Sequence, residues 1–273
     1  MKIVKQILDF YINSSIHVAL SCFALVKITF LLFNIPTNNA VSYFAFFGTI
    51  VGYNFVKFDA LARSKKNKMS TQLKAITALS FTSFFVVVFY FFKLQNTTKI
   101  IALLFLLFTV LYTLPFFPNK KNGRNWAGLK IYIVAICWVG VTVILPVINS
   151  EVAFQYYFYL IALQRFLLIF TLILIFEIID VKTDDPYLKT VPQQIGVKNT
   201  KALGFVLLII FYGLGSFTSN GNFQILELLL NFIIVIISAL FLYFSNENRS
   251  KYYTSFWVES VPIFWWFIYF FMK

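Results

Sequence analysis

The sequence predicts an all-α fold: a polytopic membrane protein with about nine transmembrane helices. Of its 273 residues, 60% are hydrophobic and 12% are charged, whereas soluble domains have about 45–50% apolar and about 25% charged residues. A soluble domain of this length could not bury so much apolar surface. Apolar stretches of spanning length, roughly 20 residues, follow one another along the chain, and the basic residues gather in alternate loops.

Each apolar stretch is expected to be helical, because lipid offers no hydrogen-bond partners to an isolated backbone segment. The stretches are continuously apolar and do not alternate as barrel strands do. We expect residues 1–273 to form a single transmembrane helical domain. The nine segments are Ile16–Ile35, Ala40–Phe58, Ala75–Phe92, Ile100–Phe117, Leu129–Ile148, Val152–Phe176, Ala202–Thr218, Phe223–Phe244 and Thr254–Met272.

The basic residues predict the orientation. With the N-terminus in the cytoplasm, 18 of the 23 Lys and Arg residues fall on the cytoplasmic side, three fall outside, and Lys27 and Arg165 fall within spans. The positive-inside rule therefore predicts a cytoplasmic N-terminus and an external C-terminus. The expected location is a bacterial inner membrane. The net charge of +13 is explained by topology and by attraction to anionic membrane lipids, and it indicates no nucleic-acid partner.

A cluster of acidic residues follows the sixth segment, on the predicted cytoplasmic side. Glu177, Asp180 and Asp184 are spaced by three and then four residues, so they share one face if the helix continues that far. Mg²⁺ commonly binds through one or two carboxylates together with substrate phosphates. The alternative is a solvated loop whose acids balance Lys182 and Lys189.

The stretch from Glu177 to Gly196 resembles the second aspartate-rich motif of the UbiA-type membrane prenyltransferases. Asp180 and Asp184 match the family's Asp positions, and Glu177 stands where an Asp is usual. Shorter pieces are similar to the family's fourth and fifth helices. The matching residues are Lys189, Thr190, Pro192 and Gly196 in the trailing part of the motif, and Leu111, Tyr112, Pro115, Gly128, Lys130 and Trp138 in the shorter pieces.

This family transfers a prenyl group from an isoprenyl diphosphate to an acceptor that is often aromatic. The resemblance implies a UbiA-like helical bundle whose catalytic residues are Asp180 and Asp184. It implies a single Mg²⁺ site formed by Glu177, Asp180 and Asp184. The implied partners are an isoprenyl diphosphate, a lipophilic acceptor and membrane lipids. The expected substrate-binding residues are Asn54, Lys57, Arg63, Tyr112, Lys130, Arg165 and Lys189.

The first aspartate-rich motif of the family is incomplete in this chain. Asn54 matches it, but Phe55, Phe58 and Ala62 occupy the three Asp positions, and Asp59 is displaced by one residue. One residue is about 100° around a helix. Half of the metal ligation that the resemblance implies is therefore missing. The resemblance favours an enzyme, with reduced activity; the alternative is a non-catalytic protein that binds a prenyl lipid.

Three further polar residues lie in the segments. Lys27 and Arg165 are near the middle of their spans, where a charge usually faces a cavity or a partner; they can also reach the interface or bond to helix carbonyls. The third hypothesis is therefore that the protein is a small transporter. Only Gly213 and Gly215 resemble the glycines of the broken helices that transporters contain. His17, at the start of the first segment, is interpreted as an interfacial polar residue.

Overall fold

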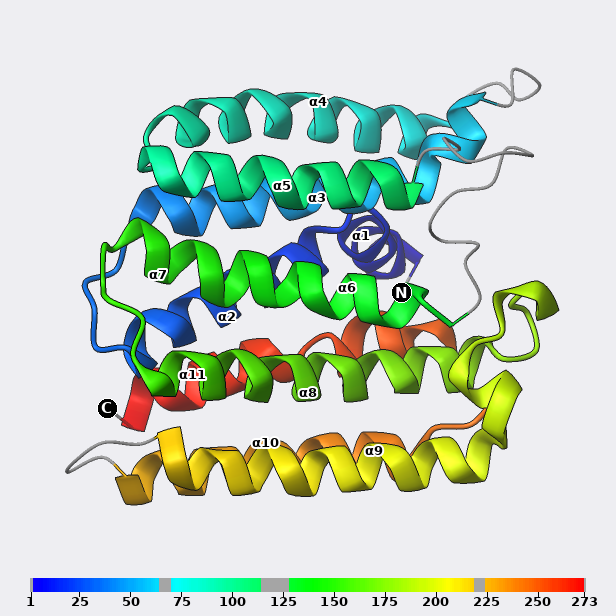
Figure 1. The fold of residues 1–273 in the computed structure, drawn as a ribbon. Helices are drawn as coiled ribbons and strands as arrows, with labels where there is room; N and C mark the ends of the chain where they lie inside the picture. Colours follow the sequence, from blue (N-terminus) through cyan, green and yellow to red (C-terminus); the bar gives the residue numbers. More distant parts are fainter. Residues whose placement is uncertain (1, 64–69, 114–127, 219–223, 273) are drawn as a thin grey trace.

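The computed structural model describes residues 2–63, 70–113, 128–218 and 224–272, without the side chains of residues 2, 59–63, 111–112, 218 and 224. Regular structure in these ranges is helical (Figure 1). The α-helices are α1 (Lys2–Asn13), α2 (Ile16–Leu32), α3 (Asn39–Arg63), α4 (Thr71–Phe92), α5 (Asn96–Thr113), α6 (Lys130–Val139), α7 (Leu145–Asn149), α8 (Tyr156–Asp180), α9 (Val191–Thr218), α10 (Gln224–Phe244) and α11 (Val261–Met272). Shorter helical turns are η3 (Gly140–Ile144), η4 (Pro186–Leu188) and η5 (Tyr253–Val258).

The nine predicted segments coincide with helices in the described part of the chain. The fifth is α6 continued through η3 into α7, and the ninth is η5 continued into α11. Six of the described helical stretches are long and apolar enough to cross a membrane, or seven if the bent pair of α1 and α2 is one span. The protein is thus an integral, multi-pass membrane protein, and nine is an approximate count.

Helix α1 was not predicted. It meets α2 at an angle of 55°, and the break falls at Ser14 and Ser15. Ser15 has φ of 62°, a left-handed conformation that a continuous helix cannot contain. Ile3 and Ile7 on α1 are exposed, whereas Ile12 is buried, so only the end of α1 next to the break enters the core.

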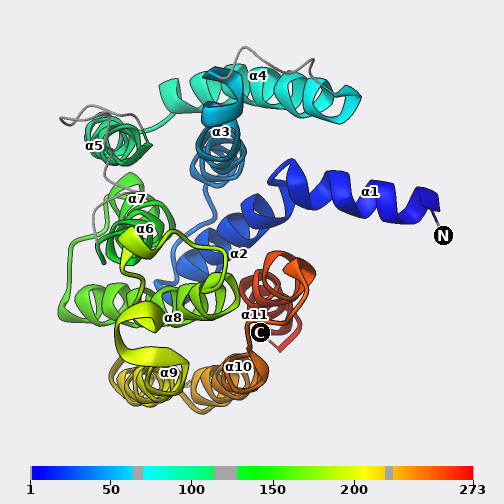
Figure 2. The same ribbon diagram turned by 90° about the vertical axis from the view of Figure 1, so that its right-hand side faces the viewer.

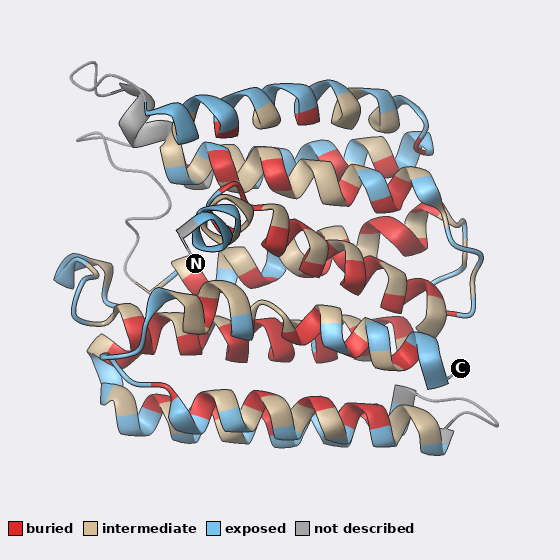
Figure 3. Ribbon diagram, turned by 180° about the vertical axis from the view of Figure 1, so that it is seen from behind, coloured by how far each residue is buried: buried red, intermediate tan, exposed pale blue. Residues whose placement is uncertain are grey.

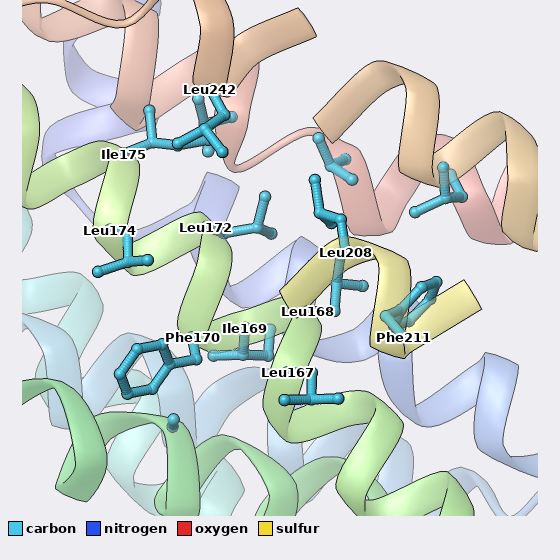
Figure 4. Close-up of a cluster of buried hydrophobic side chains, with 14 of the residues drawn as sticks. Leu167, Leu168, Ile169, Phe170, Leu172, Leu174, Ile175, Leu208, Phe211 and Leu242 are labelled. Carbon is cyan, nitrogen blue, oxygen red and sulfur yellow. The ribbon is translucent and has the colours of Figure 1, made fainter. Parts of the chain in front are cut away.

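Helix α8 lies at the centre of the bundle. In its apolar window 67% of the residues are buried, compared with 11% for α4. Figure 4 shows Leu168 and neighbouring α8 side chains facing Leu208 and Phe211 of α9 and Leu242 of α10. The burial of α8 on all sides explains why it reads as a continuous apolar run with no amphipathic period.

Many residues of the outer helices are exposed (Figure 3), and large apolar residues are among them. Phe85 on α4, Leu103 on α5 and Ile209 on α9 are each more than half exposed. Apolar surface of this extent is abnormal for a soluble monomer, and it is the surface that lipid covers in a membrane protein.

The helices run side by side between two ends of the bundle (Figures 1 and 2). One end carries the C-terminal end of α8 with Asp180, the start of α6 and the end of α3, and it faces the viewer in Figure 2. We call this the acidic end. The connection between α7 and α8 lies at the opposite end (Figure 1).

Candidate functional site at the acidic end

The acidic residues of the motif are positioned by a helix end and a tight turn. Helix α8 ends at Asp180, and the backbone N–H groups of Thr183 and Asp184 both donate to the Asp180 carbonyl at 2.8 Å. Pro186 disfavours helical geometry at the residue before it, and Asp185 has an extended ψ of 129°. The helix therefore does not continue to Asp184, so the condition under which the three acids would share one helix face is not met.

Glu177 connects two helices. Its side chain is buried, and its Oε2 accepts a hydrogen bond of 3.0 Å from the backbone N–H of Val191. Val191 is the first residue of α9, where N–H groups lack partners within the helix. One carboxylate oxygen of Glu177 is thus engaged in holding α9 against α8.

Asp184 faces a cation on another helix. Its Oδ2 lies 3.9 Å from Nζ of Lys130 at the start of α6. The same oxygen is buried and has no hydrogen-bond partner among the described residues. An unsatisfied buried acceptor is unfavourable unless a further group completes its bonding. This oxygen is therefore available to a donor or a metal ion, since no described residue supplies its hydrogen bond.

A glycine brings Lys130 to this position. The backbone N–H of Gly128 donates to the Leu188 carbonyl at 3.0 Å, which ties the start of α6 to η4. Gly128 has φ of 73°, and an added Cβ would lie 3.2 Å from Nε2 of Gln194. A residue with a side chain would be strained there. The sequence piece from Gly128 to Lys130 thus has a structural reason to contain glycine.

The turn after the acids is held by glutamines that the sequence reasoning missed. Gln193 accepts from the Thr190 N–H at 3.0 Å and donates to the Asp184 carbonyl at 3.3 Å. Gln194 donates to the carbonyl of Lys189, whose side chain is exposed. The adjacent pair of glutamines within the motif was the available signal.

The solvated-loop alternative required Lys182 to balance the motif's acids. Lys182 pairs instead with Glu247 of the loop after α10, at 2.8 Å. Asp184, by contrast, is nearest to Lys130 from within the bundle. The arrangement favours a built site over a loop whose charges compensate one another.

The residues of the incomplete first motif lie elsewhere at this end and are engaged in packing. Asn54 donates to the Ser14 carbonyl at 3.0 Å and to Ser80 Oγ at 2.8 Å, which joins α3 to α4 and to the break after α1. Lys57 donates to Ser15 Oγ at 3.1 Å. The buried Oδ1 of Asn54 has no described hydrogen-bond partner.

Two predicted substrate-binding residues, Arg63 and Tyr112, have side chains outside the described residues, as does Asp59. In the part of the chain that the structure describes, no three His, Cys, Asp or Glu side chains are grouped so that they could hold a metal. The Mg²⁺ ligand set of Glu177, Asp180 and Asp184 therefore stays a prediction.

Arg165 lies far from the acids. Fifteen residues before Asp180 on α8, it is about 22 Å away along the helix axis. Its guanidinium donates to the Leu25 carbonyl and to Thr142 Oγ1, both at 3.1 Å, and it lies 5.6 Å from the Trp265 ring centroid. Lys27 lies 5.1 Å from the ring of Phe23. The two cations contact different groups, which disfavours a shared transport site.

His17 belongs to a buried network, and its position at the membrane interface stays a prediction. Its Nδ1 is 2.8 Å from Tyr11 Oη on α1, and its Nε2 is 2.9 Å from the Phe256 carbonyl in η5. Its ring stacks on that of Phe256. The sequence around His17 could not predict this contact, because Phe256 lies 239 positions further along the chain.

The fold has known counterparts. A UbiA homologue from Aeropyrum pernix K1, in an apo structure, matches 94% of this chain and 99% of its own, with a TM-score of 0.68 and 15% identity. The chain has the UbiA fold. A UbiA homologue from Archaeoglobus fulgidus bound to GPP and Mg²⁺ matches 96% of this chain and 98% of its own, with a TM-score of 0.66 and 13% identity.

A structure of a UbiA homologue from Archaeoglobus fulgidus bound to Cd²⁺ also matches this UbiA-like chain, with a TM-score of 0.62 and 12% identity over 93% of this chain and 96% of the other. No protein-family model and no curated protein sequence matches. The resemblance expected from the motif is thus confirmed at the level of the fold.

Proposed function

We propose that this UbiA-like membrane protein binds an isoprenyl diphosphate at the acidic end and transfers its prenyl group to a lipophilic acceptor at a reduced rate. The observation that carries the proposal is the buried Oδ2 of Asp184 beside Lys130, which accepts no hydrogen bond from any residue that the structure describes. It lies in a fold shared with a UbiA homologue that was solved with GPP and Mg²⁺.

The donor chemistry here fits one Mg²⁺ ion. Asp180 and Asp184 offer two carboxylates, and Mg²⁺ is commonly held by one or two carboxylates together with substrate phosphates. When bound, the ion would supply electrostatic stabilisation of the departing diphosphate. Glu177 keeps α8 and α9 together through Val191, so its first role is to hold the geometry of the turn.

Side chains of the chain itself account for the rest of the binding. Lys130 provides a charge-assisted hydrogen bond to a phosphate oxygen. Trp138 on α6 donates to Tyr53 Oη on α3 at 2.9 Å, and their rings meet edge to face. Aromatic faces of this kind stabilise a developing allylic cation.

Reduced activity follows from the first motif. Phe55 and Phe58 stand at two positions where carboxylates are expected, and Asn54 and Lys57 are occupied by contacts with Ser14, Ser80 and Ser15. Binding a ground-state diphosphate tightly does not by itself accelerate its departure. Binding is therefore expected to exceed catalysis.

The test measures binding and turnover in one preparation. Radiolabelled geranyl, farnesyl and geranylgeranyl diphosphates are bound to the purified protein with and without Mg²⁺, and the label transferred to a membrane-lipid extract is counted. The variant Asp184→Asn is compared with Glu247→Gln, which removes an exposed carboxylate at the same end.

We expect Mg²⁺-dependent binding that Asp184→Asn weakens at least about tenfold, the loss of one charge-assisted contact, and that Glu247→Gln leaves unchanged. Absence of Mg²⁺-dependent binding contradicts the proposal. Transfer at ordinary enzyme rates, on the order of 1 per second or faster, contradicts reduced activity, and binding with no transfer at all identifies a prenyl-lipid-binding protein.

A further inference from the structure

A basic pocket lies on the outer surface of the bundle, between α9 and α10 at the acidic end. Its volume is about 560 Å³. Cations and apolar side chains line it, and the described lining contains no acid. The lining comprises Lys198, Lys201, Ala202 and Phe205 of α9, Tyr243 and Phe244 of α10, and Ser245, Asn246 and Arg249 of the following loop.

Two of the cations are held in place by the end of α10. Lys201 Nζ donates to the Tyr243 carbonyl at 2.7 Å, and Arg249 Nε donates to the Phe244 carbonyl at 2.9 Å. The guanidinium of Arg249 also lies 5.2 Å from the Tyr253 ring centroid. Cations at a helix C-terminus are stabilised by its unpaired carbonyls.

Capping the helix does not account for the whole cluster. Arg249 uses only Nε for its carbonyl, and no described hydrogen bond engages its two terminal nitrogens. Lys198 makes no described hydrogen bond or ion pair. Three like charges around one pocket repel one another unless an anion lies among them, and a guanidinium binds phosphate oxygens in pairs.

An apolar groove continues from the basic pocket. It has a volume of about 360 Å³ and shares Phe244 and Arg249 with the basic pocket, and it runs over Ile237, Leu240 and Phe241 toward Tyr253. Leu240 and Phe244 are about half exposed. The groove follows α10 away from the acidic end, along the apolar outer surface of the bundle.

We infer that the paired pockets bind one anionic phospholipid. Its phosphate lies among Lys198, Lys201 and Arg249, and an acyl chain lies in the groove along α10. The charge complements a phosphate, and the apolar continuation complements a chain that a soluble phosphate lacks. Basic pockets between transmembrane helices near the membrane surface suit anionic headgroups. The site is separate from Asp184 and does not depend on diphosphate binding there.

This inference can be tested by native mass spectrometry, in which the full chain is released from detergent micelles together with its bound lipids. Phosphatidylglycerol and phosphatidylcholine with identical acyl chains are added in equal amounts, and their retention is compared. The variant Lys201→Gln with Arg249→Gln is measured beside a matched control, Lys93→Gln with Lys99→Gln. The control removes two cations that also make one contact each, outside the pocket.

The unmodified protein is expected to retain phosphatidylglycerol preferentially. Each cation near a membrane surface contributes about fivefold to anionic-lipid binding, so the double variant should reduce the preference roughly 25-fold. The control should keep it. Lys198→Gln should reduce the preference about fivefold, and this exposed side chain has no described contact whose loss would affect folding.

Equal retention of the two lipids by the unmodified protein overturns the inference, as does a preference that survives in the double variant. A loss of preference in the control means that only total charge matters, which also overturns it. In a final arm, inorganic phosphate is added to the lipid-bound protein. Displacement of the lipid by phosphate at a concentration equal to that of the lipid identifies a site for free phosphate and rejects the phospholipid, because an acyl chain in the groove should make the lipid bind more tightly.

Discussion

Two regions at the acidic end differ in how their polar side chains are used. In the region from Glu177 to Gly196, Asp184 has a buried oxygen without a hydrogen bond among the described residues, and this oxygen lies beside the cation of Lys130. In the region from Asn54 to Ala62, the amide nitrogen of Asn54 and the ammonium group of Lys57 bond to Ser14, Ser15 and Ser80, although the buried Oδ1 of Asn54 also has no described partner. The first region sets its open oxygen beside a cation from another helix, whereas the described polar contacts of the second region join helices.

The difference shows that a fold can keep one half of a two-part site without the other. Glu177 and the glutamines of the turn hold α8, η4 and α9 together, so the residues of the first region serve structure as well as binding. The described polar contacts of the second region involve an amide, an ammonium group and serine oxygens. Its polar groups meet the backbone break between α1 and α2, which itself needs hydrogen-bond partners.

The largest expected effect concerns the side of the membrane on which both regions lie. In a background without Cys22 and Cys137, Tyr187→Cys and Thr37→Cys place one thiol at each end of the bundle. With the acidic end in the cytoplasm, as the charge distribution predicts, a membrane-impermeant thiol reagent labels Thr37→Cys on intact cells. It labels Tyr187→Cys only after the cells are broken. The reverse pattern would invert the topology.

The second prediction compares one cation from each region. Lys130→Gln removes the cation beside Asp184 and should weaken farnesyl diphosphate binding by about 2.5 kcal/mol, or roughly 70-fold, as expected for a hydrogen bond between charged groups. Lys57→Gln removes a cation already bonded to Ser15 and should cost at most about fivefold. Equilibrium binding of labelled diphosphate measures both. Equal losses would mean that the two regions contribute alike.

Asn54→Ala should act on stability and leave binding unchanged. It removes two buried hydrogen bonds, to Ser14 and Ser80, and should lower the free energy of unfolding by about 2 kcal/mol at a typical value of about 1 kcal/mol each. The control Asn199→Ala removes an exposed amide that bonds within its own helix and should cost under about 0.5 kcal/mol. Thermal unfolding in detergent gives the difference. Weakened diphosphate binding by a stably folded Asn54→Ala protein would place Asn54 in the binding site.

The smallest effect tests the backbone of the first region. Gly196 has φ of 80° and ψ of 157° within α9, a conformation that residues with a Cβ avoid. Gly196→Ala should therefore cost about 1.5 kcal/mol of stability, although nothing lies within 4 Å of the added methyl group. Gly213→Ala, equally unobstructed and without a positive φ, should stabilise α9 by about 0.5 kcal/mol. Thermal unfolding of both variants provides the measurement, and a neutral Gly196→Ala would show that the kink is not required.

Hydropathy and a short motif determined much of this protein. The apolar runs coincide with helices in the described part of the chain, because lipid requires each spanning segment to satisfy its own backbone. The resemblance of the stretch from Glu177 to Gly196 to a family motif implied the UbiA fold, which the structural comparisons confirm. The loss of the first motif was recognised from the sequence, because Phe55, Phe58 and Ala62 lack the carboxylates that the motif requires. A missing metal ligand can be recognised without knowledge of its geometry.

Only the tertiary structure decided how the polar groups are paired. Asp184 meets Lys130 across 54 positions of sequence, His17 meets Phe256 across 239, and the basic pocket joins α9 to the loop after α10. Helix α1 escaped detection because its boundary is a single left-handed serine, which composition does not mark. Hydrophobicity is additive along the chain and can be read locally, whereas a hydrogen bond or ion pair exists only after packing brings its two ends together.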